Sequence, residues 1–90
     1  MREWRIEYTD KVLAELEVLD RPVRRQIIDR LEWFAEHFHE LTPVPLHGDW
    51  KGFFKFRIGD RRVVYNFESS KQLIQVHQID RRDKIYKRHS

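Results

Sequence analysis

The dipeptide Gly59-Asp60 constrains the fold of this chain more than any other feature. It separates two strand-like runs, GFFKFRI and RRVVYNFE. Such a dipeptide between two runs of this kind is a strong signal for a β-hairpin with a two-residue loop. The loop length fixes the register, and the facing pairs are then Ile58 and Arg61, Arg57 and Arg62, Phe56 and Val63, and Lys55 and Val64.

The predicted register gives the hairpin one apolar face and one basic face, because side chains alternate across a sheet. Like charges directly opposite one another destabilise a ladder, where opposite charges would contribute about 0.2–1 kcal/mol. The basic face therefore suggests an anion site, and an ordinary solvated face is the alternative. By the same alternation Arg61 does not belong to this face, and it is interpreted as a charged residue flanking the turn. The apolar face, expected beneath the helices, carries Phe54, Phe56, Ile58, Val63, Tyr65 and Phe67, and the basic face carries Lys55, Arg57, Arg62 and Val64.

Two helices are predicted between a first strand and the hairpin. The segment EWRIEY alternates apolar and charged residues, which is typical of a half-buried strand. Thr9 or Asp10 can cap the first helix, and Asp20 can cap the second, with Pro22 tolerated in its first turn. The apolar positions are Val12, Leu13, Leu16 and Leu19 in the first helix, and Val23, Ile27, Leu31, Phe34 and Phe38 in the second.

The remaining segments complete a single α+β domain over residues 1–90. ELTPVPLHGDW, with two prolines and a glycine, is predicted to be a connecting loop, and QLIQVHQI to be the last strand. We therefore expect an N-terminal strand, a helical hairpin and a three-stranded antiparallel meander, forming one sheet with the helices on one face. For the last strand two choices stay open: either Ile74 and Val76, or Leu73 and Ile79, point inward.

The positive charge is concentrated in the second half of the chain. Residues 47–90 carry eleven Lys and Arg against five Asp and Glu, whereas residues 1–46 carry seven against ten. This asymmetry is typical of a surface that faces nucleic acid, with a merely solubilising surface as the alternative. The absence of cysteine excludes disulfides and thiolate metal sites. No segment reads as a membrane span or a signal peptide, so we expect a soluble cytoplasmic protein.

The basic face has a chemistry that suits RNA. RNA is cleaved without a metal when its own 2′-hydroxyl attacks the adjacent phosphate. That reaction needs a base, cations for the charge on the phosphorane, and an acid for the departing 5′ oxygen. Lysine, arginine and tyrosine can supply all three roles, and no carboxylate or histidine pair is evident instead.

The segments PLHGDWKGFFKFRIGDRRVVYNF and IQVHQIDRRDKIYKR resemble the RelE/ParE superfamily of bacterial and archaeal type II toxins. The resemblance covers nearly the whole chain and implies a small toxin held inactive by a cognate antitoxin. In the RelE branch the toxin enters the ribosomal A site on the 30S subunit and cleaves mRNA there. ParE-like members instead poison DNA gyrase and lack the catalytic residues.

The resemblance also implies site residues. Lys55 would be the base or a base-like cation, Arg57 and Arg62 would hold the phosphate, Arg82 would be an acid or a second clamp, and Tyr86 would stack on the nucleotide. Two departures leave the acid and base roles open: Arg57 stands where lysine also occurs, and Arg61 stands where an aromatic residue is common. Arg81 is a rival to Arg82. Further substrate-binding residues are expected at Lys51, Arg61, Arg81 and His77.

Other aromatic and histidine residues have competing interpretations. Trp50 and Phe53 are expected to anchor their loop, with stacking on RNA bases as the alternative. His77 is expected to be structural unless it joins the basic face. His37 and His39 are interpreted as surface residues rather than metal ligands.

These observations predict a ribosome-dependent mRNA endoribonuclease that needs neither metal nor cofactor and leaves a 2′,3′-cyclic phosphate. Its partners would be an antitoxin, the ribosome and mRNA, with operator DNA bound only through the antitoxin complex. The alternatives are a gyrase inhibitor without nuclease activity, and an inactive member that binds its antitoxin and regulates their shared promoter.

Overall fold

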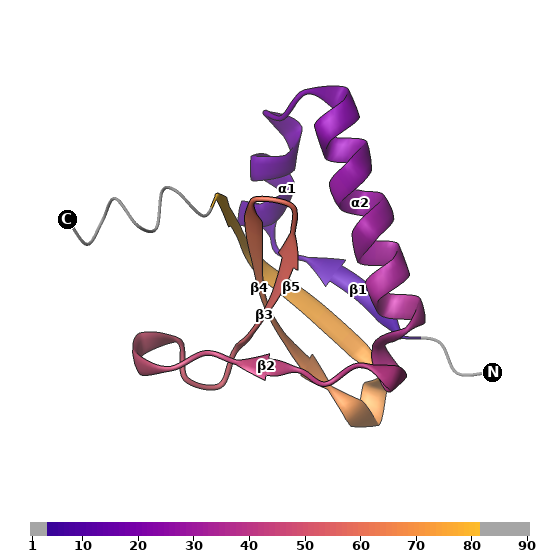
Figure 1. Ribbon diagram of the computed structural model, residues 1–90, viewed down its shortest axis with the longest axis vertical. Helices are drawn as coiled ribbons and strands as arrows, with labels where there is room; N and C mark the ends of the chain where they lie inside the picture. The colour runs from indigo at the N-terminus through magenta and orange to yellow at the C-terminus, as the bar shows by residue number, and fades with distance from the viewer. Residues whose placement is uncertain (1–3, 82–90) are drawn as a thin grey trace.

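Two helices cover one face of a five-stranded sheet in the computed structural model, which describes residues 4–81 (Figure 1). The strands lie in the order β1-β5-β4-β3-β2; β1 is parallel to β5, and the other neighbours are antiparallel. The α+β class and the helices on one face are as predicted. The elements are β1 (Arg5–Tyr8), α1 (Asp10–Glu17), α2 (Arg21–Glu36), η1 (Phe38–Glu40), β2 (Val44–Pro45), η2 (Gly48–Trp50), β3 (Phe54–Ile58), β4 (Arg61–Glu68), η3 (Ser69–Lys71) and β5 (Leu73–Arg81).

The sheet has one strand more than the sequence predicted. The strand β2 lies inside the segment that was expected to be only a loop, and it pairs Val44 with Lys55 and Pro45 with Phe54. Proline cannot donate a hydrogen bond to a ladder and is therefore confined to sheet edges, which is where β2 lies. The prolines that indicated a loop are thus compatible with a short edge strand.

The helices begin where their capping residues predicted. The hydroxyl of Thr9 accepts a hydrogen bond from the Val12 backbone N–H at 3.3 Å, while Asp20 occupies the N-cap of α2 without such a bond. Leu13 is 47% exposed, so its assignment to the buried side of α1 was wrong; it lies about 100° around the helix from Val12. Within residues 4–81 no helix is long and apolar enough to cross a membrane.

A β-bulge decides the orientation of β5. Val64 pairs with Gln78, but the next residue, Tyr65, pairs with Val76, so His77 is an extra residue on β5. The alternation of side chains therefore changes phase within the strand. The first sequence-based choice, Ile74 and Val76, was right; of the second choice only Ile79 is also buried on the helix side, because the bulge changes the phase between Val76 and Ile79.

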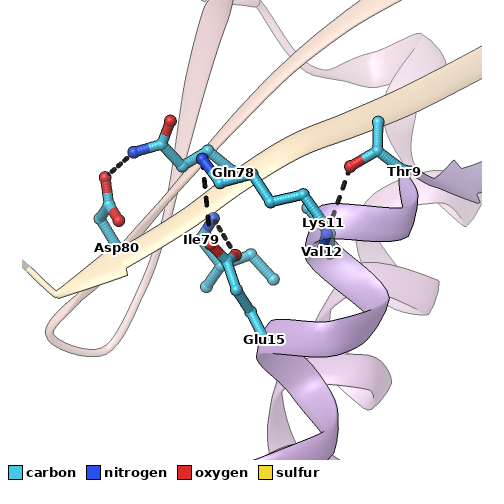
Figure 2. A network of polar contacts seen from close by, with 7 residues as sticks. All are labelled: Thr9, Lys11, Val12, Glu15, Gln78, Ile79 and Asp80. Atoms are coloured by element: carbon cyan, nitrogen blue, oxygen red, sulfur yellow. Dashed lines mark hydrogen bonds and ion pairs between the residues drawn. The ribbon is translucent and has the colours of Figure 1, made fainter.

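The helix α1 protects the part of β5 that extends beyond β1. β1 ends opposite Val76, where the Thr9 N–H still bonds to the Val76 carbonyl at 3.2 Å. Further along, the Glu15 carboxylate accepts a hydrogen bond from the Ile79 N–H at 3.4 Å, as Figure 2 shows. Lys11, one turn earlier on α1, lies 4.0 Å from the same carboxylate. These contacts fix the end of β5 against α1.

The hairpin register agrees with the prediction at each of its four predicted pairs. Gly59 has a φ of +59°, a conformation that L residues rarely adopt, although a Cβ there would meet no atom within 4 Å. We expect Gly59→Ala to lower the free energy of unfolding by about 1–2 kcal/mol through backbone strain alone, measured by urea denaturation. Asp60→Ala is the matched control, because it removes only an exposed ion pair to Arg81. Equal stability of the two variants would contradict this account of the turn.

Candidate nucleic-acid interface

Three cations lie together on the face of the sheet that points away from the helices. Arg57 of β3 lies directly opposite Arg62 of β4. Lys55 lies on β3 two residues before Arg57. Facing residues have Cβ atoms about 4.5–5.5 Å apart, and two residues along a strand span about 6.6 Å. Lys55, Arg57 and Arg62 are called the basic face below.

The basic face is not neutralised from within the described chain. No ion pair in residues 4–81 involves any of the three cations. The Nε atom of Arg62 is buried and has no hydrogen-bond partner among these residues. A buried donor without a partner costs about 1–3 kcal/mol. An anion that accepts a hydrogen bond from Arg62 would relieve this cost, so the arrangement favours binding of a negatively charged group.

A carboxylate also lies on this side, and the sequence analysis missed it. Asp80 of β5 is the cross-strand neighbour of Arg62 and accepts a hydrogen bond from the side chain of Gln78 (Figure 2). Simple alternation from Ile74 and Val76 would have turned Asp80 toward the helices. The bulge reverses that phase, and only the register across β4 reveals it.

An aromatic cluster lies next to the basic face. The rings of Phe53 and His77 are 5.0 Å apart at 88°, and those of Trp50 and Phe53 are 5.3 Å apart at 86°. Phe53 precedes β3 and His77 belongs to β5, so their contact crosses the intervening β4. Val64 of β4 is 0% exposed although it points away from the helices, so other side chains cover it on this side of the sheet. The basic face thus borders an apolar, ring-covered area.

His77 is held in one orientation within this cluster. Its Nε2 lies 3.0 Å from the side-chain oxygen of Asn66, on the neighbouring strand β4. Burial lowers the pKa of His77 below its ordinary value, because the charged imidazolium is less well solvated there. The ring is therefore mostly uncharged at neutral pH. His77 joins the outward side of the sheet, a position that the sequence left open.

The family model for the ParE toxin of type II toxin–antitoxin systems, parDE, matches residues 6–86. The chain belongs to this family of toxins. The family lies within the RelE/ParE superfamily, as the resemblance of the hairpin and tail indicated. A comparison with curated proteins found no match.

Solved structures similar to the toxin include RelE proteins and their complexes. The RelBE2 toxin–antitoxin complex of Mycobacterium tuberculosis matches with a TM-score of 0.76 and 16% identity, over 90% of this chain and 100% of the other. The archaeal RelE–RelB complex of Pyrococcus horikoshii has a TM-score of 0.70 and 17% identity, over 90% and 97%. The isolated RelE toxin of Escherichia coli has a TM-score of 0.67 and 18% identity, over 99% and 100%. At these identities the likeness shows a shared fold.

The other site residues predicted for the toxin are dispersed. Arg61 and Arg81 face each other across β4 and β5 and line a pocket of about 180 Å³ beside the end of α1, on the other side from the basic face. Lys51 is exposed in the turn before β3. Arg82 and Tyr86 lie outside the described residues. The structure therefore brings together Lys55, Arg57 and Arg62, with His77 beside them.

The two helix-end histidines of the toxin have local contacts. The ring of His37 stacks on that of Trp33 at 4.4 Å, and its Nδ1 lies 2.9 Å from the Trp33 carbonyl oxygen. His39 lies 3.4 Å from the Glu40 carboxylate, and both are exposed. Among residues 4–81 no group of three metal-ligating side chains is present.

Proposed function

We propose that this toxin is an mRNA endoribonuclease that acts in the ribosomal A site and arrests translation. The observation that carries the proposal is the basic face, in which Arg57 and Arg62 directly face each other and form no ion pair within residues 4–81. Two arginines in this arrangement repel each other in the free protein and can jointly bind a phosphate, whose oxygens match the guanidinium fork. The similarity of the fold to RelE toxins supports the same proposed function.

The basic face can promote RNA cleavage by transesterification. The 2′ oxygen forms a bond to phosphorus while the bond from phosphorus to the 5′ oxygen breaks, which leaves a 2′,3′-cyclic phosphate and a free 5′-hydroxyl. Arg57 and Arg62 stabilise the negative charge that develops on the phosphorane. Lys55 or Asp80 accepts the proton of the 2′-hydroxyl. The 5′ oxygen receives a proton from Arg82 or from water, and Tyr86 stacks on the nucleotide.

The proposal includes partners. Two of the similar structures, from Mycobacterium tuberculosis and Pyrococcus horikoshii, are toxin–antitoxin complexes, so we expect a cognate antitoxin to bind this toxin. An antitoxin that covers the basic face would inhibit it, and operator DNA would be bound only through that complex. The toxin would bind the ribosome and mRNA in the cytoplasm.

Inhibition of DNA gyrase is the second candidate function. It is favoured by the matching family model, which is named for ParE. A gyrase poison has no need of a phosphate-binding triad on the sheet, so the two candidates predict different effects of substitutions on the basic face.

Arg57→Ala tests the proposal. We expect mRNA cleavage at A-site codons to fall at least about tenfold, because one phosphate-binding cation is lost. Cleavage is measured by mapping mRNA 5′ ends after expression of each variant. The free energy of unfolding should stay within about 0.5 kcal/mol of the wild type, because Arg57 is exposed.

Arg25→Ala is the matched control, since it removes an exposed arginine from α2, away from the sheet face. It should cleave mRNA like the wild type. Growth arrest by the wild type with intact mRNA and broken DNA would refute the proposal and support the gyrase alternative.

A further inference from the structure

The aromatic cluster beside the basic face has a geometry suited to a ligand. Trp50, Phe53 and His77 come from η2, the residue before β3 and the bulge of β5, and all three are only partly buried. Their planes meet at 86° and 88°, so they form a corner with rings in two orientations rather than a single stack. These three residues are called the aromatic corner below.

Anchoring of the loop does not by itself require the contact between Phe53 and His77. The loop before β3 is already closed by backbone hydrogen bonds, from Leu46 N–H to the Phe53 carbonyl at 2.9 Å and from Phe53 N–H to the Trp50 carbonyl at 3.0 Å. His77 belongs to another strand, in which it is the extra residue of the bulge. Bulges commonly re-aim a side chain next to an active site.

The aromatic corner is aligned with the basic face. Phe53 precedes Lys55 by two residues, so both side chains point to the same side of β3, about 6.6 Å apart along the strand. Arg57 follows after the same interval. A polynucleotide that lays a phosphate on Arg57 and Arg62 can therefore run along β3 and bring a neighbouring base to the rings.

We propose that Trp50, Phe53 and His77 form a nucleobase-binding subsite for a nucleotide adjacent to the phosphate bound by the basic face. The subsite deepens the proposed function and rests on it. Aromatic rings stack on any base, because every base has a π-face. The uncharged ring of His77 suits such a contact, and the amide of Asn66, which holds that ring, lies beside it.

The test compares two RNA probes that carry the same phosphates. One is a six-nucleotide 2′-O-methyl oligouridylate, which cannot be cleaved, and the other is its abasic analogue of equal length. Binding of each fluorescently labelled probe to the full-length toxin is measured by anisotropy at low salt. We expect the base-bearing probe to bind the wild type about tenfold more tightly, which is the range of stacking on an aromatic residue.

Variants separate the two parts of the site. Phe53→Leu and His77→Ala should bring the affinity ratio of the two probes close to one and leave the abasic probe unaffected. Arg62→Gln should weaken both probes equally and preserve the ratio, because it removes only a phosphate contact. A residue that merely anchored the loop would not change the ratio.

The subsite and the proposed function fail in different ways. Equal affinity of the wild type for the two probes, binding of neither, or an unchanged ratio in both Phe53→Leu and His77→Ala would overturn the subsite. Full mRNA cleavage by the Arg57→Ala toxin would overturn the role of the basic face instead, whatever the ratio of the probes.

Discussion

Arg62→Ala should lower the rate of mRNA cleavage on translating ribosomes by about 100-fold or more, because removing one preorganised charge-stabilising donor typically has that effect. Arg62 lies at the centre of the basic face, opposite Arg57 on one side and Asp80 on the other. Its buried Nε has no partner among the described residues, so the guanidinium is left without a compensating hydrogen bond at that atom. Cleavage is followed by mapping mRNA 5′ ends, with toxin abundance measured in parallel.

Two further variants make the result specific to the guanidinium. Arg62→Lys keeps the charge but loses the planar fork, so it should recover part of the activity. Arg25→Ala removes an exposed arginine elsewhere and should cleave normally. The Arg62→Ala toxin should also remain folded, because the substitution removes the charge repulsion between Arg62 and Arg57. Undiminished cleavage by Arg62→Ala would show that the basic face is not the phosphate site.

The hairpin was predictable because local chemistry determines it. The length of the loop at Gly59-Asp60 sets the register, and the register sets which side of the sheet each residue occupies. Burial of Tyr65 and exposure of Arg57 follow from that single assignment, and both are observed. The position of the cation cluster therefore follows from the sequence of the hairpin alone.

The rest of the site could not be placed because it depends on contacts between strands distant in sequence. The bulge at His77 is visible only as a shift between Val64 and Tyr65 in the pairing of β4 with β5. It turns Asp80 to the side of the basic face, and no period-2 pattern predicts such a change of phase. The assignments of Arg82 and Tyr86 stay predictions, since both residues lie outside the described chain.

The sheet that carries the site is held in place by an aromatic core around Phe34 of α2. Phe34 is 3% exposed, and its ring centroid lies 4.0 Å from that of Phe56, 5.1 Å from that of Tyr65 and 5.2 Å from that of Phe38. Phe56 lies between Lys55 and Arg57, and Tyr65 follows Val64. The ring of Phe34 therefore packs against the two strands, β3 and β4, that carry the basic face.

Phe34→Ala should lower the free energy of unfolding by about 3–5 kcal/mol, because it removes a buried ring and leaves a cavity between α2 and the sheet. For a domain of this size, the loss corresponds to a fall of about 15 °C or more in Tm, measured by circular dichroism. Val18→Ala is the control, since Val18 is 82% exposed and should change stability by less than about 0.5 kcal/mol. A Phe34→Ala toxin as stable as this control would show that α2 does not hold the sheet.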